Sequence, residues 1–304
     1  MKFGKLSDIS QVDFKLPPDA SDNQSLLSGY NFVSQPLLFT GCTGWSMKDW
    51  VGKIYPQNAK AKDFLKYYTR QFNTIELNTT HYRIPGPDLI KKWQLNSNSD
   101  FKFCPKIPQS ISHSRELGLK DDKLIIFTEV IQQLEEKLGC CFMQLPPYFD
   151  FPRLGLLEAF LLKFPAHIPL AIEVRHMSWF DSKATINALS ALLKQYNRIF
   201  LITDVAGRRD VLHQKLTTNK AMIRFVGNGL HPTDYQRIEQ WLKRLKKWYE
   251  YGLEETYFFI HQPENVLAPD MVTYFVERAK SVLPGVITRG PKMNTAEGHQ
   301  MSLF

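Results

Sequence analysis

The 304-residue chain is predicted to be an α/β protein that folds as a single-domain TIM-type (β/α)8 barrel. Short apolar runs alternate with longer stretches of helical spacing, and the starts of these runs recur about every 31 residues. Most connections are long enough to hold a helix, which parallel strands need for a right-handed crossover. The rhythm covers about 250 residues, the ordinary size of one such barrel.

The barrel is expected to occupy residues 36–285. Residues 1–35 are polar and irregular and are predicted to be an extension ahead of it, while 286–304 form a tail. The apolar runs predict eight strands, at 37–42, 74–78, 101–106, 140–145, 170–175, 199–204, 222–226 and 257–261.

Between the strands, apolar residues three and four positions apart predict amphipathic helices. The clearest helix spans 234–251, and Thr233 with Gln236 has the spacing of a capping box at its start. A last helix follows Pro269, whereas 207–219 is too short for a helix to be predicted there.

The alternative architecture is an open, doubly wound sheet. No G-x-G-x-x-G pattern follows the first strand, and the strand rhythm does not break at a midpoint as two half-domains would require. The GCTG sequence at 41–44 lacks the spacing and the lysine of a phosphate loop. We therefore favour the barrel and expect no nucleotide cofactor.

Composition narrows the class of protein. The 38 Lys and Arg against 30 Asp and Glu give a net charge of +8, and 43% hydrophobic residues are too many for a disordered chain. The apolar stretches are far shorter than the ~18 residues of a membrane span, and the N-terminus has no secretory h-region, so a cytoplasmic protein is expected. Cys42, Cys104, Cys140 and Cys141 lack metal-site spacing and are expected to be reduced, buried thiols.

The predicted strands carry polar residues near their carboxyl ends. Glu76 and Asn78 are two apart and share one face, as do Glu173 and Arg175. Five further strands end on a polar residue: Lys106, Gln144, Asp204, Arg224 and His261. Buried charges are costly, and barrel enzymes place their active sites at this end, so a ligand site is favoured over a purely structural ion-pair network.

Several motifs together resemble the YecE-like family, the domain-of-unknown-function family numbered seventy-two. They are GCTGWS at 41–46, FNTIELNTTHY at 72–82, FKFCPK at 101–106, QLPP at 144–147 and EVRHMSWF at 173–180. The resemblance covers about residues 37–283 and implies a TIM-type barrel, but it implies no settled activity. The chain departs from the family after the eighth strand, where HQPEN at 261–265 replaces an aromatic residue, asparagines and a glycine-containing loop.

The family's patterned positions fall on residues in most of the strand ends and the loops after them. They are Gly44, Trp45, Glu76, Asn78, Tyr82, Lys106, His113, Gln144, Glu173, Arg175, Ser178, Trp179, Asp204 and Arg224.

Candidate site residues follow from these positions. The catalytic candidates are Glu76, Lys106, Glu173 and Asp204, and the substrate-binding candidates are Trp45, Asn78, Tyr82, His113, Gln144, Arg175 and Arg224. Glu76 and Glu173 would act as general acid and base. Lys106, Arg175 and Arg224 would hold an anion. For Lys106, a role as base or Schiff-base nucleophile is the alternative to ion pairing or anion binding.

The sequence therefore predicts an enzyme acting on a small phosphate- or carboxylate-bearing substrate, by hydrolase, lyase or isomerase chemistry. A divalent metal on Glu76, Glu173, Asp204 and His113 is not favoured, because the neighbouring cations would repel it. The alternative function is nucleic-acid binding or processing, for which Arg208, Arg209, His213 and Lys215 lie in one loop. A non-catalytic ligand-binding barrel is a third possibility, and no membrane or protein partner is inferred.

Overall fold

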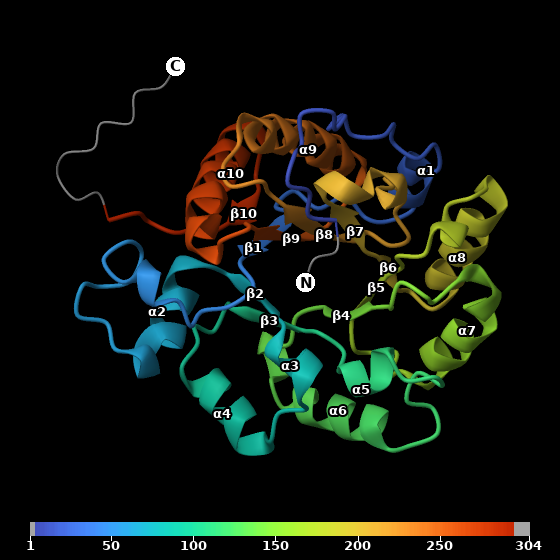
Figure 1. Ribbon diagram of the computed structural model, residues 1–304, viewed down its shortest axis with the longest axis horizontal. Helices are drawn as coiled ribbons and strands as arrows, with labels where there is room; N and C mark the ends of the chain where they lie inside the picture. The colour runs from blue at the N-terminus through green and yellow to red at the C-terminus, as the bar shows by residue number, and fades with distance from the viewer. Residues whose placement is uncertain (1–3, 295–304) are drawn as a thin grey trace.

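The computed structural model describes residues 4–294 and contains parallel strands surrounded by helices (Figure 1). The strands are β1 (Leu37–Gly41), β2 (Thr74–Leu77), β3 (Lys102–Pro105), β4 (Cys141–Gln144), β5 (Leu170–Glu173), β6 (Ile199–Phe200), β7 (Ile202–Asp204), β8 (Lys220–Val226), β9 (Glu255–His261) and β10 (Ile287–Thr288). The helices are α1 (Asn23–Leu27), α2 (Phe64–Gln71), α3 (Thr79–Tyr82), α4 (Pro87–Leu95), α5 (Gln109–Ser112), α6 (Lys123–Gln132), α7 (Leu154–Lys163), α8 (Lys183–Gln195), α9 (Pro232–Tyr251) and α10 (Ala268–Val282).

Every strand pairing is parallel, and the strands form three sheets. Their orders are β10-β1-β9-β8-β7, β2-β3 and β4-β5-β6. The parallel α/β prediction is confirmed and each of the eight apolar runs forms a strand, but the sheets do not close into one continuous ladder. A few backbone hydrogen bonds join neighbouring sheets: Glu76 N–H donates to the Cys42 carbonyl (3.1 Å), Gly139 N–H to the Phe103 carbonyl (2.7 Å) and Ile107 N–H to the Phe142 carbonyl (2.8 Å).

The sixth predicted strand is divided in two. β6 and β7 lie on either side of Leu201, whose N–H donates to the Ile172 carbonyl at 2.9 Å, and they belong to different sheets.

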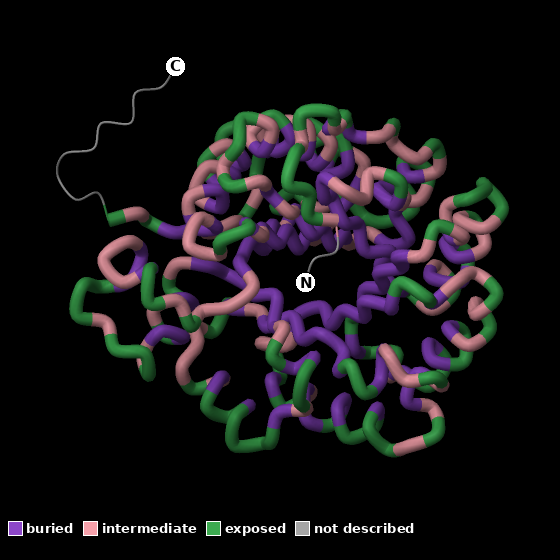
Figure 2. The backbone as a smooth tube through the Cα atoms, viewed as in Figure 1, coloured by how far each residue is buried: buried purple, intermediate pink, exposed green. Residues whose placement is uncertain are grey.

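Alternate strand residues face opposite sides of the sheets, one set toward an inner apolar cluster and the other toward the helices. Phe39, Cys104, Phe142, Met222 and Phe259 are buried in one cluster that lies between the sheets. The intervening residues pack outward against the helices, and Figure 2 shows the buried strands inside and the exposed backbone mostly on the helices. The four cysteines are free and buried, as expected.

The helix predicted at 234–251 is present as α9, but its predicted start is wrong. His231 is the N-cap, and its side chain accepts a hydrogen bond from the Thr233 N–H; Thr233 and Gln236 form no capping box. Pro232 occupies the first helical position, where a fixed φ and a missing N–H cost nothing. No helix in residues 4–294 combines the length and the apolar character that crossing a bilayer requires.

The predicted polar extension is packed against the rest of the chain. Leu27 is fully buried, and the buried Asn23 donates to the Gln214 carbonyl at 2.6 Å and accepts from Leu216 N–H at 2.9 Å. At the other end of the chain, β10 pairs with β1, a strand that the sequence did not predict. Residues 295–304 of the predicted tail lie outside the described residues.

Candidate functional site

Seven polar side chains from six strands, with two of them at the end of β5, meet at the carboxyl ends of the strands. We call them the strand-end cluster: Glu76, Lys106, Gln144, Glu173, Arg175, Arg224 and His261. Side chains two apart on a strand share a face, so Lys106 follows the inward-facing Cys104, and Gln144 follows Phe142. The pleat therefore places the cluster directly above the inner apolar core.

Arg224 joins the two carboxylates of the cluster. Its Nε and Nη2 donate to Glu76 at 3.0 and 2.9 Å, and its Nη1 donates to Glu173 Oε2 at 2.8 Å. His261 Nε2 lies 2.8 Å from Glu76 Oε2, and the side chain of His261 is 19% exposed. Asn78 Nδ2 donates to the other Glu76 oxygen at 3.0 Å. Glu76 therefore orients a partly exposed imidazole and an amide.

Glu173 lies at the centre of a second chain of hydrogen bonds. Arg175 Nε donates to its Oε1 at 2.7 Å, and Gln144 Nε2 donates to its Oε2 at 2.9 Å. Gln144 in turn accepts from Lys106 Nζ at 3.0 Å. The neutral amide thus separates the ammonium group from the carboxylate.

Both carboxyl groups are ionised at neutral pH. Burial opposes the ionisation of Glu76, but Arg224 and His261 hold its pKa well below the usual value. Burial likewise opposes the ionisation of Glu173, but the charges of Arg175 and Arg224 lower the pKa of this carboxyl group to about 2. Neither group carries a proton to donate, so the acid half of the expected carboxylate pair needs another residue.

Within the described part of the cluster, Lys106 is the cation without a carboxylate partner. It is 2% exposed, and among the described residues no carboxylate oxygen lies within 4 Å of its Nζ. Burial and then the charge of Arg224 lower its pKa to about 8. With three cations against two carboxylates, the described part of the cluster has an excess of one positive charge.

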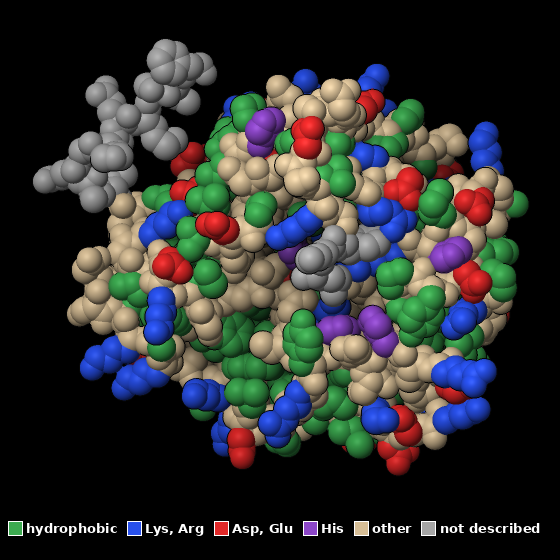
Figure 3. All heavy atoms as spheres, viewed as in Figure 1, with side chains coloured by type: hydrophobic (Ala, Val, Ile, Leu, Met, Phe, Trp, Pro, Cys, Tyr) green, Lys and Arg blue, Asp and Glu red, His purple; other side chains and the backbone are tan. Residues whose placement is uncertain are grey.

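Two further histidines lie beside the cluster, next to the candidate Tyr82. The ring of His81 lies 5.4 Å from that of His113 and 5.3 Å from that of Tyr82. Burial lowers the pKa of His81 to about 4 and also lowers the pKa of His113, and the charge of Lys106 contributes to both shifts. Tyr82 is 78% exposed. Figure 3 shows histidine and basic side chains at the centre of this face.

Trp45 lies in an aromatic contact away from these hydrogen bonds. Its ring meets that of Trp93 edge-on at 6.0 Å, and its carbonyl accepts from the Tyr55 hydroxyl at 2.9 Å. Among the described residues, no hydrogen bond or aromatic contact joins Trp45 to the cluster.

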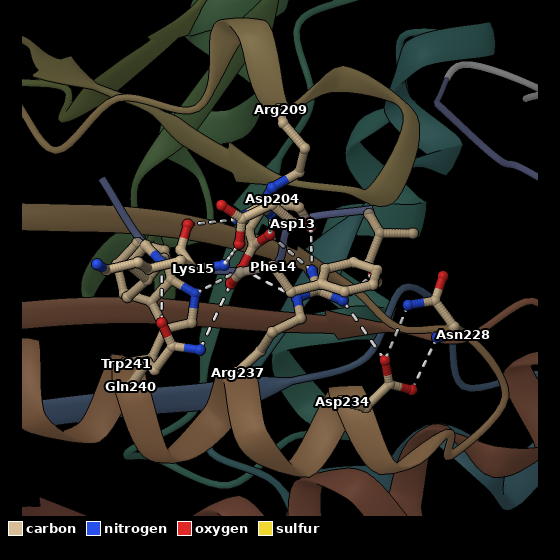
Figure 4. A network of polar contacts seen from close by, with 12 residues as sticks. Asp13, Phe14, Lys15, Asp204, Arg209, Asn228, Asp234, Arg237, Gln240 and Trp241 are labelled. Atoms are coloured by element: carbon tan, nitrogen blue, oxygen red, sulfur yellow. Dashed lines mark hydrogen bonds and ion pairs between the residues drawn. The ribbon is translucent and has the colours of Figure 1, made fainter. Parts of the chain in front are cut away.

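Asp204, a predicted catalytic residue, faces the opposite way. Leu201 belongs to the inner core, so Asp204, three residues on, points outward toward α9. There it accepts from Trp241 Nε1 at 2.7 Å and pairs with Arg237 (2.7 Å) and Arg209. Arg237 also contacts Asp234 at 3.4 Å. We call Asp204, Arg209, Asp234 and Arg237 the outer network (Figure 4).

The N-terminal segment covers the outer network. The guanidinium of Arg237 lies 5.1 Å from the ring of Phe14, and Arg209 donates to the Lys15 carbonyl at 3.2 Å (Figure 4). The structure thus separates Asp204 from the other catalytic candidates, and residues 4–294 hold no group of three His, Cys, Asp or Glu placed to bind a metal ion.

Fold and site together define a parallel α/β protein with a charged cluster at the carboxyl ends of its strands. The chain belongs to the family described as "Protein of unknown function DUF72", whose model matches residues 39–295. The resemblance read from the sequence motifs is therefore confirmed.

Individual relatives agree with this assignment. The UPF0759 protein YecE of Escherichia coli K12 is 28% identical over 268 residues, covering 82% of this chain and 95% of the relative. The UPF0759 protein YunF of Bacillus subtilis is 25% identical over 243 residues, covering 69% and 84%. A crystal structure of a DUF72 family protein from Enterococcus faecalis matches with a TM-score of 0.65 at 18% identity, covering 83% of this chain and 99% of that one.

The structure adds three residues to the predicted sets, one in the cluster, one beside it and one in the outer network. His261 was recognised as a strand-end residue but not assigned to the site, and its spacing from Phe259 would have placed it there. His81 follows directly after β2 and could have been found from that position. Arg237 lies on a predicted helix, where nothing in the sequence marks it as a partner of Asp204.

Proposed function

We propose that this protein is an enzyme that binds a small phosphate- or carboxylate-bearing substrate at the strand-end cluster. One observation supports this above the others: Lys106 is a buried cation whose hydrogen-bond partner is a neutral amide. Such a charge costs several kcal/mol unless an opposite charge compensates it. A bound anion would supply that charge.

The proposal includes the closed TIM-type barrel. The three parallel sheets would be arcs of one ring, bridged by a few backbone hydrogen bonds such as that from Glu76 to Cys42. Barrel enzymes of this type carry their active sites at the carboxyl ends of the strands, where the cluster lies.

In this proposal the residues of the cluster have different roles. Arg175 and Arg224 offer the planar donors that suit carboxylate and phosphate oxygens. His261, partly exposed and held by Glu76, moves the proton, while Glu76 and Glu173 position their partners. Hydrolase, lyase and isomerase reactions all use such a set.

The nucleic-acid alternative is not supported by the loop that suggested it. Arg208 pairs with Asp210 at 2.9 Å, and Lys215 with Asp22 at 3.0 Å. Arg209 pairs with Asp204, and the buried His213 stacks on Phe200. These side chains are engaged within the protein.

The test is calorimetric titration with inorganic phosphate and with oxalate at constant ionic strength. The wild type is compared with Lys106→Met and with Lys91→Met, a change at an exposed lysine of α4. Binding should persist in Lys91→Met and weaken at least about tenfold in Lys106→Met, because a paired buried charge contributes more than 1.4 kcal/mol. Equal binding by both variants, or none by the wild type, would overturn the proposal.

A further inference from the structure

The surroundings of Lys106 suit an amine nucleophile. The residue follows β3 directly, its side chain is buried, and its Nζ makes one hydrogen bond, to Gln144 Oε1 at 3.0 Å. Its other neighbours include the face of the Phe142 ring, with Nζ 6.0 Å from the ring centroid. An ammonium held this way is stabilised less than one paired with a carboxylate.

Nearby positive charges also disfavour the charged form of Lys106. Arg224 and Arg175 both disfavour the charged form of Lys106, whereas Glu76 and Glu173 favour it less strongly than burial opposes it. Desolvation and a neighbouring cation are the two means by which proteins activate lysine as a nucleophile toward carbonyl groups. With its pKa lowered to about 8, roughly a tenth of Lys106 is the free amine at pH 7.

We propose that Lys106 forms a Schiff base with a substrate that carries an aldehyde or ketone next to its carboxylate or phosphate group. This inference rests on the anion site proposed above and names the substrate class for that site. The guanidinium groups would hold the anionic end, and Nζ would reach the carbonyl carbon.

The step balances without a further reactant. The Nζ lone pair forms a C–N bond to the carbonyl carbon while the C=O pair moves to oxygen. Two protons pass from nitrogen to that oxygen, the C–O bond breaks, and water leaves. His261, which is held by Glu76 and partly exposed, would carry these protons, as in the function proposed above.

The experiment is reductive trapping of the full chain. Wild-type protein is incubated with glyoxylate or pyruvate and cyanoborohydride near pH 7.5, and the adducts are located by peptide mass spectrometry. Lys106 should be modified about tenfold faster than Lys91, or more, because far more of it is free amine. Lys106→Arg should lose this adduct, and Lys91→Arg should keep it.

A competition experiment removes any dependence on the variants folding. Oxalate, which has the anionic groups but no aldehyde or ketone, should slow modification of Lys106 and leave that of Lys91 unchanged. If oxalate binds but Lys106 is modified no faster than Lys91, the Schiff base is overturned while the anion site stands. If oxalate and phosphate do not bind either, both proposals are overturned.

Discussion

Two buried ion-pair networks lie at the carboxyl ends of neighbouring strands, and they differ in net charge. The outer network sets Asp204 and Asp234 against Arg209 and Arg237, so its described charges cancel. The strand-end cluster, which faces inward, combines two carboxylates with three cations.

The networks also differ in what covers them. Phe14, Trp241 and the N-terminal segment pack over the outer network, and both Arg237 and Asp204 are 0% exposed. The cluster keeps His261 partly open to solvent. On the proposed function, the balanced, covered network stabilises the fold, and the unbalanced, partly open cluster would bind a charged ligand. Three substitutions test this distinction.

The largest effect is expected for Arg237→Met. The change leaves Asp204 and Asp234 buried with much of their compensating charge removed, and breaking a buried pair in this way costs about 3–5 kcal/mol. Urea unfolding at pH 7 measures the loss. Calorimetry on the folded protein should still show anion binding.

The matched control is Arg70→Met, at an exposed position of α2, where the unfolding free energy should change by no more than about 0.5 kcal/mol. If Arg237→Met were as mild as this control, or if it abolished anion binding in folded protein, the outer network would not be purely structural.

A second, intermediate effect concerns acid stability and Glu173. Its pKa is about 2 in the folded protein and near 4.5 in the unfolded chain. Between these values the unfolded chain holds the extra proton, so stability present above about pH 4.5 is lost as the pH falls toward 2.

In Glu173→Gln this contribution is absent. The variant should be less stable than wild type at pH 7, because Arg175 and Arg224 lose a partner, but its stability should fall less steeply below pH 4.5. The difference amounts to at most about 1.4 kcal/mol per pH unit. Urea unfolding from pH 7 to pH 3 measures it, and Glu158→Gln, on an exposed position of α7, should retain the wild-type slope. Parallel curves for Glu173→Gln would refute the linkage.

The sequence predicted the strands and most of the cluster because both follow from alternation. Glu173 and Arg175 share a face with Ala171, and Arg224 shares one with Met222, so strand parity alone places them inside. The same rule places Asp204 outside, because Ile199 and Leu201 face the inner core and Phe200 and Ile202 face outward. Its position at the end of a strand suggested a place in the cluster, but strand parity contradicts it.

Pairing partners were less predictable than positions. The sequence offered three carboxylates for three cations, and only the structure shows that Asp204 pairs with Arg237 and Arg209 instead. Without Asp204, the described part of the cluster has two carboxylates for three cations. The packed N-terminal segment was missed for a related reason: its polar composition hides a few buried contacts, such as those of Asn23.

The smallest effect separates the two networks most directly, because its sign is opposite to that of Arg237→Met. Lys106→Met removes a buried cation that has no carboxylate partner, and at pH 7 we expect a gain of about 1–2 kcal/mol in unfolding free energy, reduced by the hydrogen bond that Gln144 loses.

The folded pKa of about 8 lies below the value of 10.5 for an unperturbed lysine, so the cost of the charge is fully present below pH 8. Above pH 8 the unfolded chain holds more protons, and wild-type stability should rise until the advantage of the variant disappears near pH 10. Urea unfolding at pH 7, 8, 9 and 10, with Lys91→Met as control, measures this convergence. A loss of stability in Lys106→Met at pH 7 would show that Lys106, like Arg237, holds the fold together, and the distinction between the networks would fail.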